Sequence, residues 1–309
     1  MRGRISFRPG AVQHIYQNTY NGFLVFYSVR DFLAFFTIFT TTARRYNVRI
    51  LGLCLMVDHL HVLVEAPNKA ELSRFVHDYT WRFSMARNAW YGEGGAFFRS
   101  PFGRASKVSD KDIRSAIAYL YNNPVERQMC NRPEQAQWNF LAYAVSGHPF
   151  SQPLRLEKAS APMRRAIEEA KVSRREDTPL NYLRLEQMTR KLRPEEQLQL
   201  TDLIVSSYNC IDYDDLIGHF DSHEKLVIAL NTTKGSEYSI KEEFVGRSDR
   251  IYGRMSNFLL LSRRIATIDD LLRLSEEERR DLMEPLAMRT GASRKQIEKY
   301  LHLPPAIES

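Results

Sequence analysis

The chain has 309 residues, of which 43% are hydrophobic and 26% are charged, as is usual for a globular protein. No apolar stretch reaches the roughly 18 to 20 residues of a membrane span, and no apolar signal core follows the basic N-terminus. The three cysteines, Cys54, Cys130 and Cys210, are far apart, which argues against a disulfide framework and against a cysteine-rich zinc site. We therefore expect a cytoplasmic protein that does not contact a membrane, and the length favours two domains.

The net charge of +7 is unevenly distributed along the chain. Residues 1–150 carry 18 Lys and Arg against 10 Asp and Glu, and residues 151–193 carry 11 against 6. Residues 194–309 carry 15 against 21 and are therefore acidic. The basic excess of the first 193 residues indicates a polyanionic partner such as nucleic acid, although basic surfaces without that role are as common.

The first 150 residues contain both strand and helix patterns. β-Branched and aromatic residues predict strands at 23–29, 48–57 and 61–66. Helices are predicted at 31–46 and at 69–91, where apolar residues form a stripe, and residues 91–104 read as a glycine-rich loop. A third helix is predicted to start at the Ser109 cap and to end near Asn122 or Asn123, before Pro124. This order predicts an α+β fold, an antiparallel sheet with helices on one face.

Beyond residue 150 the strand signal fades and helices dominate. Residues 151–193 form a basic linker or helix, and residues 194–309 form an all-α C-terminal domain that includes a long helix over 239–265. Residues 282–303 have the spacing of a helix-turn-helix, with Ser293 and Gln296 as a capping box. An ordinary helical hairpin is the alternative. If the motif reads duplex DNA, its outward side chains are Arg294, Lys295, Gln296 and Lys299.

The run VDHLHVLVEAP carries His59 and His61 on what reads as a buried strand. Residues two apart on a strand point to the same face, about 7 Å apart along the backbone. A single histidine on an apolar face is more often a hydrogen-bonded core residue. Two histidines on one face, flanked by Asp58 and Glu65, form a candidate pair of metal ligands that lacks a third member.

The third helix offers the missing groups. Tyr119 and Asn123 are four residues apart and therefore lie on one helical face. Together with the histidines they would supply three metal ligands and a nucleophile. Tyr79 and Tyr121 are the rival nucleophiles, but Tyr79 lies on an apolar stripe and Tyr121 faces roughly the other side of the third helix.

These motifs resemble those of the REP-associated tyrosine transposases, within the single-tyrosine HUH transposases of bacteria. The resemblance covers roughly residues 10–150. LCLMVDHLHVLVEAP is similar to the HUH strand, AYLYNNPVERQ to the tyrosine helix followed by Asn-Pro-Val, and QWNFLAY to the aromatic segment that ends the domain. Two features depart from the family pattern: Asp58 stands where Asn or Glu is common, and the helical half is longer than in compact members.

The resemblance implies a ferredoxin-like HUH domain over residues 1–150, often dimeric, that acts on single-stranded DNA with hairpin structure. His59, His61 and Asn123 would hold a divalent metal, Mg²⁺ or Mn²⁺, and Tyr119 would form a 5′-phosphotyrosine intermediate of DNA cleavage and strand transfer. Basic residues near the site and on the helix-turn-helix are the candidate DNA contacts: Arg74, Arg82, Arg99, Arg104, Lys107, Arg114, Arg294, Lys295 and Lys299.

Two other functions remain open from the sequence. A domesticated HUH domain could hold hairpin DNA, or regulate transcription through its helix-turn-helix, without turnover. A metallohydrolase of unrelated fold would use the histidines with an Asp or Glu and leave Tyr119 without a role. A covalent protein–DNA adduct distinguishes the transposase from both.

Overall fold

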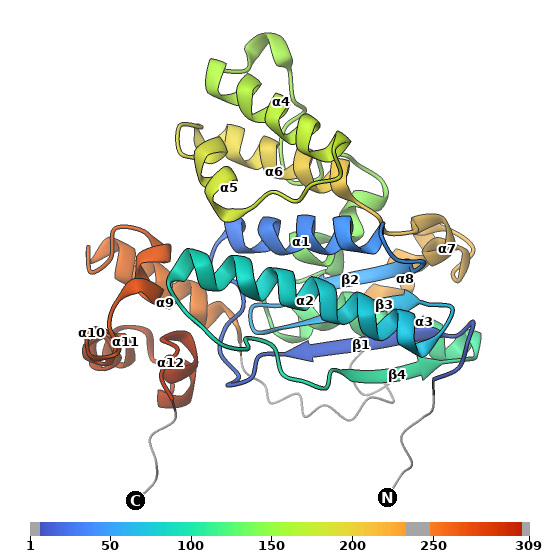
Figure 1. Cartoon of the computed structure of the whole chain (residues 1–309), viewed down its shortest axis with the longest axis horizontal. Helices are drawn as coiled ribbons and strands as arrows, with labels where there is room; N and C mark the ends of the chain where they lie inside the picture. The colour runs from blue at the N-terminus through green and yellow to red at the C-terminus, as the bar shows by residue number, and fades with distance from the viewer. Residues whose placement is uncertain (1–6, 233–247, 305–309) are drawn as a thin grey trace, which may run out of the picture.

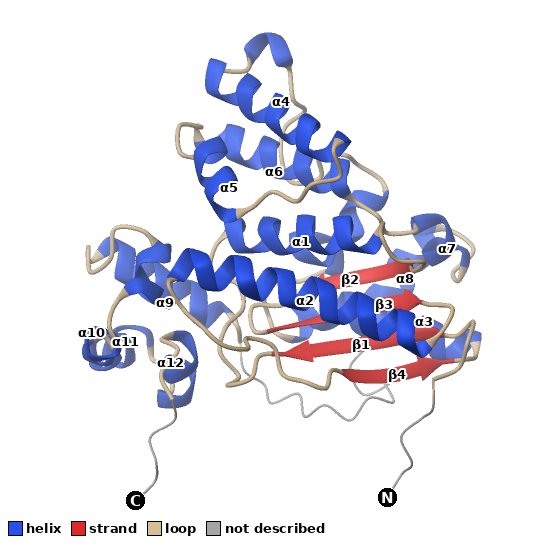
Figure 2. Cartoon of the chain, viewed as in Figure 1, coloured by secondary structure: helices blue, strands red, loops and turns tan. Residues whose placement is uncertain are grey.

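A four-stranded antiparallel sheet lies at the centre of the N-terminal half. The computed structural model describes residues 7–232 and 248–304. The strands are β1 (Val12–Asn18), β2 (Arg49–Leu55), β3 (His59–Glu65) and β4 (Gly103–Lys107). Their order in the sheet is β2–β3–β1–β4 (Figures 1 and 2), and the register of the central pair sets Tyr16 opposite His61. The predicted α+β class with an antiparallel sheet is confirmed.

Helices cover both faces of this sheet, so the prediction of helices on one face was wrong. The helices α1 (Val29–Ala43) and α2 (Lys69–Tyr91) pack on the face to which β3 contributes Leu60, Val62 and Val64. On the other face, α3 (Asp110–Glu126) packs against Leu51, Cys54 and Leu63. The periodicity of a helix predicts which of its sides is apolar, but not which face of a sheet it covers.

Residues 23–28 form a loop and not the predicted strand. The loop ends at Ser28, which caps α1 in a capping box with Asp31. Leu24, Val25 and Phe26 are buried, and the backbone amides of Val25 and Phe26 donate to the carbonyl of Val57. Burial of this loop, and not strand pairing, accounts for its apolar composition.

Strands β1 and β4 were not predicted. β1, VQHIYQN, contains the buried polar residues Gln13, His14 and Gln17, which hide the apolar alternation of a half-buried strand. β4 begins at Gly103, within the predicted loop. A Cβ atom at Gly103 would lie 2.2 Å from Cδ1 of Tyr16, so glycine leaves room for the Tyr16 ring on the neighbouring strand.

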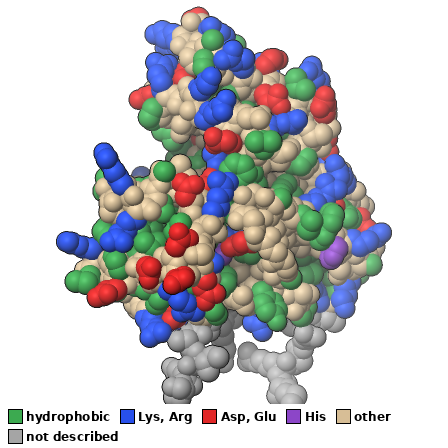
Figure 3. Space-filling view, turned by 60° about the vertical axis from the view of Figure 1, so that its left-hand side comes forward, with side chains coloured by type: hydrophobic (Ala, Val, Ile, Leu, Met, Phe, Trp, Pro, Cys, Tyr) green, Lys and Arg blue, Asp and Glu red, His purple; other side chains and the backbone are tan. Residues whose placement is uncertain are grey.

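Three helices form a lobe over α1, at the top of Figure 1. They are α4 (Ala161–Arg175), α5 (Tyr182–Thr189) and α6 (Pro194–Tyr208). Their apolar side chains, such as Met163, Leu185 and Ile204, belong to the same core as α1 and α2. Lys and Arg side chains are numerous on the outer surface of this lobe in Figure 3. The basic segment 151–193 thus includes two helices, and the boundaries at 150 and 193 stay predictions.

Two short helices of the C-terminal half cover α3. They are α7 (Tyr213–Gly218) and α8 (His223–Thr232). Leu216 of α7 and Leu226 and Leu230 of α8 share a core with residues 116–121 of α3. The face of α3 that points away from the sheet is therefore buried by the C-terminal half.

The last helices form a bundle beside the sheet end where β1 ends and β3 begins, at the left of Figure 1. The bundle comprises α9 (Arg250–Leu261), a 3₁₀ helix (Ile268–Arg273), α10 (Glu276–Asp281), α11 (Met283–Thr290) and α12 (Arg294–Tyr300). Its core includes Leu24 from the loop before α1. The predicted helix over 239–265 lies partly outside the described residues, and its described part forms α9.

The α11–α12 pair has the local features that the sequence predicted. Gly291 ends α11 in the left-handed conformation, with φ of 70°, which glycine adopts without strain. Ser293 then caps α12, and Gln296 completes the capping box. The DNA-reading role of this helix pair stays a prediction.

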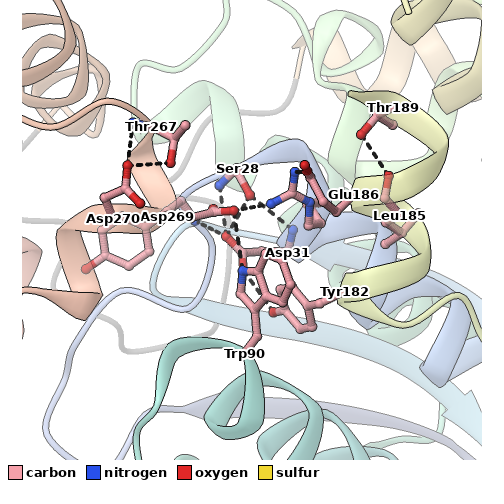
Figure 4. Close-up of polar contacts among 12 residues, drawn as sticks. Ser28, Asp31, Trp90, Tyr182, Leu185, Glu186, Thr189, Thr267, Asp269 and Asp270 are labelled. Atoms are coloured by element: carbon pink, nitrogen blue, oxygen red, sulfur yellow. Dashed lines mark hydrogen bonds and ion pairs between the residues drawn. The ribbon is translucent and has the colours of Figure 1, made fainter. Parts of the chain in front are cut away.

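A polar junction at the start of α1 joins four parts of the chain (Figure 4). Arg30 forms ion pairs with Glu186 of α5 and with Asp269 of the 3₁₀ helix. The buried carboxylate of Asp31 accepts hydrogen bonds from the hydroxyls of Tyr91 (2.9 Å) and Tyr182 (2.8 Å). Within the described residues, no helix is long and apolar enough to cross a membrane.

Candidate active site

His59 and His61 both point from β3 toward the sheet face that α3 covers. Both side chains are buried, and their ring centroids lie 4.9 Å apart at 87°. Leu60, between them, points into the core on the opposite face. In the structure the two histidines thus share one face of the strand, as their spacing of two residues predicted.

Tyr119 and Asn123 face these histidines from α3. Asn123 Nδ2 lies 3.2 Å from His61 Nε2, and the Tyr119 ring centroid lies 5.2 Å from that of His61. α3 continues through Pro124 to Glu126, beyond the predicted end. A proline disfavours helical geometry in the residue before it, but the side chain of Asn122 donates to the carbonyl of Leu230 in α8 and helps to hold this end of α3. The structure therefore brings together all four residues that the motifs singled out.

His14 of β1 belongs to the same cluster and was missed. Its Nε2 lies 3.1 Å from His61 Nδ1, and its ring centroid lies 5.6 Å from that of Tyr119. Alternation along β1 places Val12, His14 and Tyr16 on one face, and this signal could have identified His14 had β1 been recognised. His14 is placed to fix the orientation of the His61 ring.

Burial keeps both members of this histidine pair neutral. It lowers the pKa of His14 to about 3, with a smaller effect of Lys107. Burial also lowers the pKa of His61 well below its usual value, and the neighbouring His59 and His14 add to this. With Nδ1 of His61 donating to His14, its Nε2 carries a lone pair, as the adjacent Asn123 amide requires. A neutral imidazole with a free lone pair is the form that binds metals.

His59 is oriented by the carboxylate of Asp58. Asp58 Oδ1 lies 2.5 Å from His59 Nδ1, and Asp58 Oδ2 accepts from the ammonium of Lys299. Burial raises the pKa of Asp58, but the charges and hydrogen bonds of His59 and Lys299 together hold it well below its usual value. A carboxylate on Nδ1 leaves Nε2 of His59 as the nitrogen available to a ligand, as is common in metal sites.

The cluster fits a divalent cation only if Asn123 takes part. Among residues 7–232 and 248–304, no three His, Cys, Asp or Glu side chains are grouped to hold a metal. Asn123 Oδ1 is buried and has no hydrogen-bond partner. A half-turn of its amide would present this oxygen to His61 Nε2 at the same 3.2 Å, close to the roughly 3 Å between neighbouring ligands of an octahedral ion with bonds of about 2.1 Å. This distance and the nitrogen and oxygen donors of His59, His61 and Asn123 therefore suit a divalent cation.

A cleft of about 380 Å³ opens beside this cluster. Its wall is formed by Tyr16, Asn18, Thr19, Tyr20, Gly22, Asp58, His59, Arg99, Asn123, Arg127 and Lys299. Three of these residues are cationic and come from separate parts of the chain. Tyr119 and His61 are not part of the wall, and both are fully buried behind it.

The predicted DNA contacts are not gathered at this cleft, apart from Arg99 and Lys299. Three of the arginines form ion pairs within their own helices: Arg74 with Glu71, Arg82 with Asp78 and Arg294 with Glu298. Arg104 and Lys107 lie on β4, and Arg114 and Lys295 are exposed on α3 and α12. Arg127, which was not predicted, lines the cleft. The prediction that Lys299 faces outward was wrong, because α12 turns this side chain toward Asp58.

The rival tyrosines lie elsewhere. Tyr79 is buried among the side chains of α1 and α2, on the opposite face of the sheet from the histidines. Tyr121 is buried on α3, and its hydroxyl approaches Gly52 of β2. Burial raises the pKa of Tyr121 well above its usual value. Of the three candidate tyrosines, Tyr119 lies against the histidine cluster.

The fold and this cluster together define a class of protein. Its members have an antiparallel sheet in which a His-hydrophobic-His strand faces a Tyr and an Asn on a helix. Residues 25–123 match the sequence model of the family described as IS200-like transposases. Over this segment the chain is similar to the IS200-like transposases, and the match confirms the resemblance at the level of the family. The match includes His59, His61, Tyr119 and Asn123, and leaves out β1 and everything after Asn123.

A solved structure of a REP-associated tyrosine transposase bound to a REP hairpin is similar over 52% of this chain and 96% of that chain. The sequence identity is 15% and the TM-score is 0.41. No curated protein matches the chain.

Proposed function

We propose that the protein is a metal-dependent single-stranded DNA endonuclease and strand transferase. The observation that carries the proposal is the contact between β3 and α3, which sets Asn123 Nδ2 3.2 Å from His61 Nε2 and the Tyr119 ring 5.2 Å from the His61 ring. The family match over the same residues supports it. The proposed substrate is DNA with hairpin structure, as in the transposases that the motifs resemble.

In the proposed reaction, the hydroxyl oxygen of Tyr119 attacks a backbone phosphorus atom. A bond forms between phosphorus and the tyrosine oxygen, and the bond from phosphorus to the 3′ oxygen breaks. The phenolic proton passes to the 3′ oxygen, which leaves as a free 3′-hydroxyl, and the phosphate stays linked to Tyr119 at its 5′ side. This link conserves the phosphodiester, so a 3′-hydroxyl of another strand can reverse the step and complete strand transfer.

The residues around Tyr119 would have different roles in this reaction. His59, His61 and Asn123 would hold a divalent cation, which would polarise a non-bridging phosphate oxygen. Asp58 and His14 orient the two imidazoles. Arg99 and Arg127 in the cleft wall offer guanidinium groups to the DNA backbone. Duplex binding by α11–α12 and homodimer formation are further proposals.

The test is the covalent adduct on a denaturing gel with a labelled single-stranded hairpin and Mn²⁺. The wild type should form the adduct and Tyr119→Phe should not, while hairpin binding stays within a few-fold. Tyr121→Phe is the matched control, because this tyrosine lies on the same helix and is equally buried. An adduct that persists in Tyr119→Phe, or that disappears in Tyr121→Phe alone, would overturn the assignment.

A second candidate function is favoured by the complete burial of Tyr119. A domesticated protein that holds hairpin DNA, or regulates transcription, has no need of an accessible nucleophile. For cleavage, the side chains that cover Tyr119 must shift when DNA binds. Hairpin binding without an adduct at any Mn²⁺ concentration would support the binding protein over the enzyme.

A further inference from the structure

Lys299 is the one residue in the cleft wall that comes from the C-terminal bundle. It lies outside the segment that matches the transposase family, and more than 100 residues after Arg127 along the chain. α12 is nevertheless held firmly against the N-terminal half. The Tyr27 hydroxyl donates to the carbonyl of Tyr300, and Ile297 and Leu301 share a core with Leu24. Packing, and not a flexible tail, brings Lys299 to the site.

The ammonium of Lys299 connects the bundle to the candidate metal ligands. It donates to Oδ2 of Asp58, whose other oxygen lies 2.5 Å from His59 Nδ1. An ammonium has three donors, and Asp58 uses one of them. The Lys299 side chain is 26% exposed and Asp58 is 9% exposed, so the lysine is the more accessible partner at the cleft.

The charges of the cleft explain why a positively charged side chain is needed beside Asp58. A DNA phosphate that approaches His59 must also approach the buried carboxylate of Asp58, and like charges repel most strongly where water is excluded. Lys299 offsets the charge of Asp58, and Arg99 and Arg127 provide two more cations in the same wall. Arg127 also lies 3.9 Å from the buried carboxylate of Asp249, which it offsets in part. With these three side chains, the cleft is suited to the phosphates of a single strand.

We propose that Lys299 is a phosphate-binding residue of the cleavage site, so that the C-terminal bundle completes the active site. The inference rests on the proposed function. Lys299 contacts the phosphate at or next to the scissile bond, while its contact with Asp58 keeps His59 in place. Because α12 carries this group, the bundle affects cleavage directly and not only through the recognition of a separate DNA segment.

The first experiment compares Lys299→Gln and Lys299→Arg with the wild type in single-turnover adduct formation at saturating hairpin. Lys299→Gln should lower the rate roughly 100-fold, as the loss of one transition-state donor commonly does, and Lys299→Arg should restore part of it. Lys225→Gln is the matched control, because Lys225 forms an exposed pair with Asp221 on the surface. An unchanged rate in Lys299→Gln would overturn the proposal.

The second experiment separates phosphate contact from a structural role. Hairpin affinity is measured between about 50 and 200 mM salt with Tyr119→Phe as the background, so that no cleavage occurs. Lys299→Gln should reduce the slope of log affinity against log salt by about 0.7, the value for one phosphate contact on a single strand. A slower rate with an unchanged slope would mean that Lys299 acts only through Asp58, which overturns the phosphate contact.

A third measurement uses the wild type, in case Lys299→Gln does not fold. Acetylation of lysines is followed by mass spectrometry with and without the hairpin. DNA should protect Lys299 several-fold and leave Lys225 reactive, whereas equal labelling of Lys299 in both states would refute the contact. A wild type that binds the hairpin but forms no adduct would refute the proposed function, and protection and salt slope would still decide whether Lys299 binds phosphate.

Discussion

The orientation of His61 depends on the imidazole of His14. Nδ1 of His61 lies 3.1 Å from Nε2 of His14, so one proton is shared between the two rings and the other nitrogen of His61 is left for a ligand. The groups that hold a metal-binding histidine in place commonly change metal affinity or activity by 10- to 100-fold when they are removed. His14 is thus expected to contribute to metal binding without contacting the metal.

We expect His14→Ala to lower the cleavage rate roughly 10- to 100-fold at limiting Mn²⁺, and less at high Mn²⁺. His14→Gln, whose amide oxygen can still accept from His61, should retain more activity. The measurement is the rate of adduct formation over a series of Mn²⁺ concentrations, with His148→Ala as an exposed control. If His14→Ala has the same Mn²⁺ dependence as the wild type, His14 does not support the metal site.

The site residues that could be predicted are those on elements with a clear period. His59 and His61 lie on an apolar strand, where a spacing of two fixes a common face, and Tyr119 and Asn123 lie four apart on a helix. His14 escaped because β1 has polar side chains on both faces, including the buried Gln13 and Gln17. A strand whose polar residues form a site does not show the alternation by which strands are recognised.

The start of α1 is the element that joins the helical lobe and the bundle to the sheet (Figure 4). Arg30, with a side chain 19% exposed, lies between Glu186 and Asp269, and Asp269 is 8% exposed. Burial raises the pKa of Asp269, and the charge of Arg30 opposes this. Removal of Arg30 would leave the nearly buried carboxylate of Asp269 without its cation and close to the partly exposed Glu186.

Arg30→Met is therefore expected to lower the free energy of unfolding by about 3 kcal/mol, the usual cost of breaking a largely buried ion pair. Urea unfolding provides the measurement. Arg280→Met is the control, since Arg280 pairs with Glu276 at the surface of α10 and should cost less than about 1 kcal/mol. Equal losses in the two variants would mean that the junction does not depend on Arg30.

Elements were predicted well where a cap and an apolar stripe coincide. The bounds of α2 agree with the prediction from sequence, and α12 has its predicted capping box. The loop at 23–28 was misread as a strand because its burial comes from contacts with Val57 and the distant bundle. Tertiary contacts of this kind leave no local pattern in the sequence.

At the scale of the whole molecule, Glu93 ties α2 to the end of the chain. It pairs with the buried guanidinium of Arg87, and its Oε1 lies 3.3 Å from Nδ1 of His302, just beyond α12. Burial works to raise the pKa of Glu93, but the hydrogen bond from His302 and the charge of Arg87 lower it to about 2. An acid with a lowered pKa stabilises the fold only while it is ionised.

The stability that Glu93 provides should be complete above its unfolded pKa of 4.5 and should be lost as the pH falls toward about 2. We expect the difference in unfolding free energy between the wild type and Glu93→Gln to be larger at pH 7 than at pH 3, and to shrink as the pH falls below about 4.5. Urea unfolding across this range measures it, with Glu277→Gln as an exposed control. A difference that does not vary with pH would contradict this prediction.

The C-terminal half packs against the N-terminal half at three places. α6 shares a core with α1, α8 buries the outer face of α3, and the bundle encloses Leu24. Each contact buries apolar side chains of both halves, so neither half can unfold without exposing the core of the other. The predicted boundaries at 150 and 193 would then separate segments of the sequence that unfold together in one cooperative transition.

We expect the full chain to unfold in a single transition. The tryptophans, Trp81, Trp90 and Trp138, all lie in the first 150 residues, so their fluorescence reports mainly on the N-terminal half. Trp90 also contacts Asp269 and Tyr182, so a Trp90→Phe background removes the contribution of the junction. Far-UV circular dichroism reports mainly on helices, most of which follow residue 150. The two signals should therefore give coincident curves in urea, with one midpoint. If the fluorescence midpoint differs from that of circular dichroism, the helical half unfolds by itself, and the contact of Lys299 with Asp58 must then form between two independently stable parts.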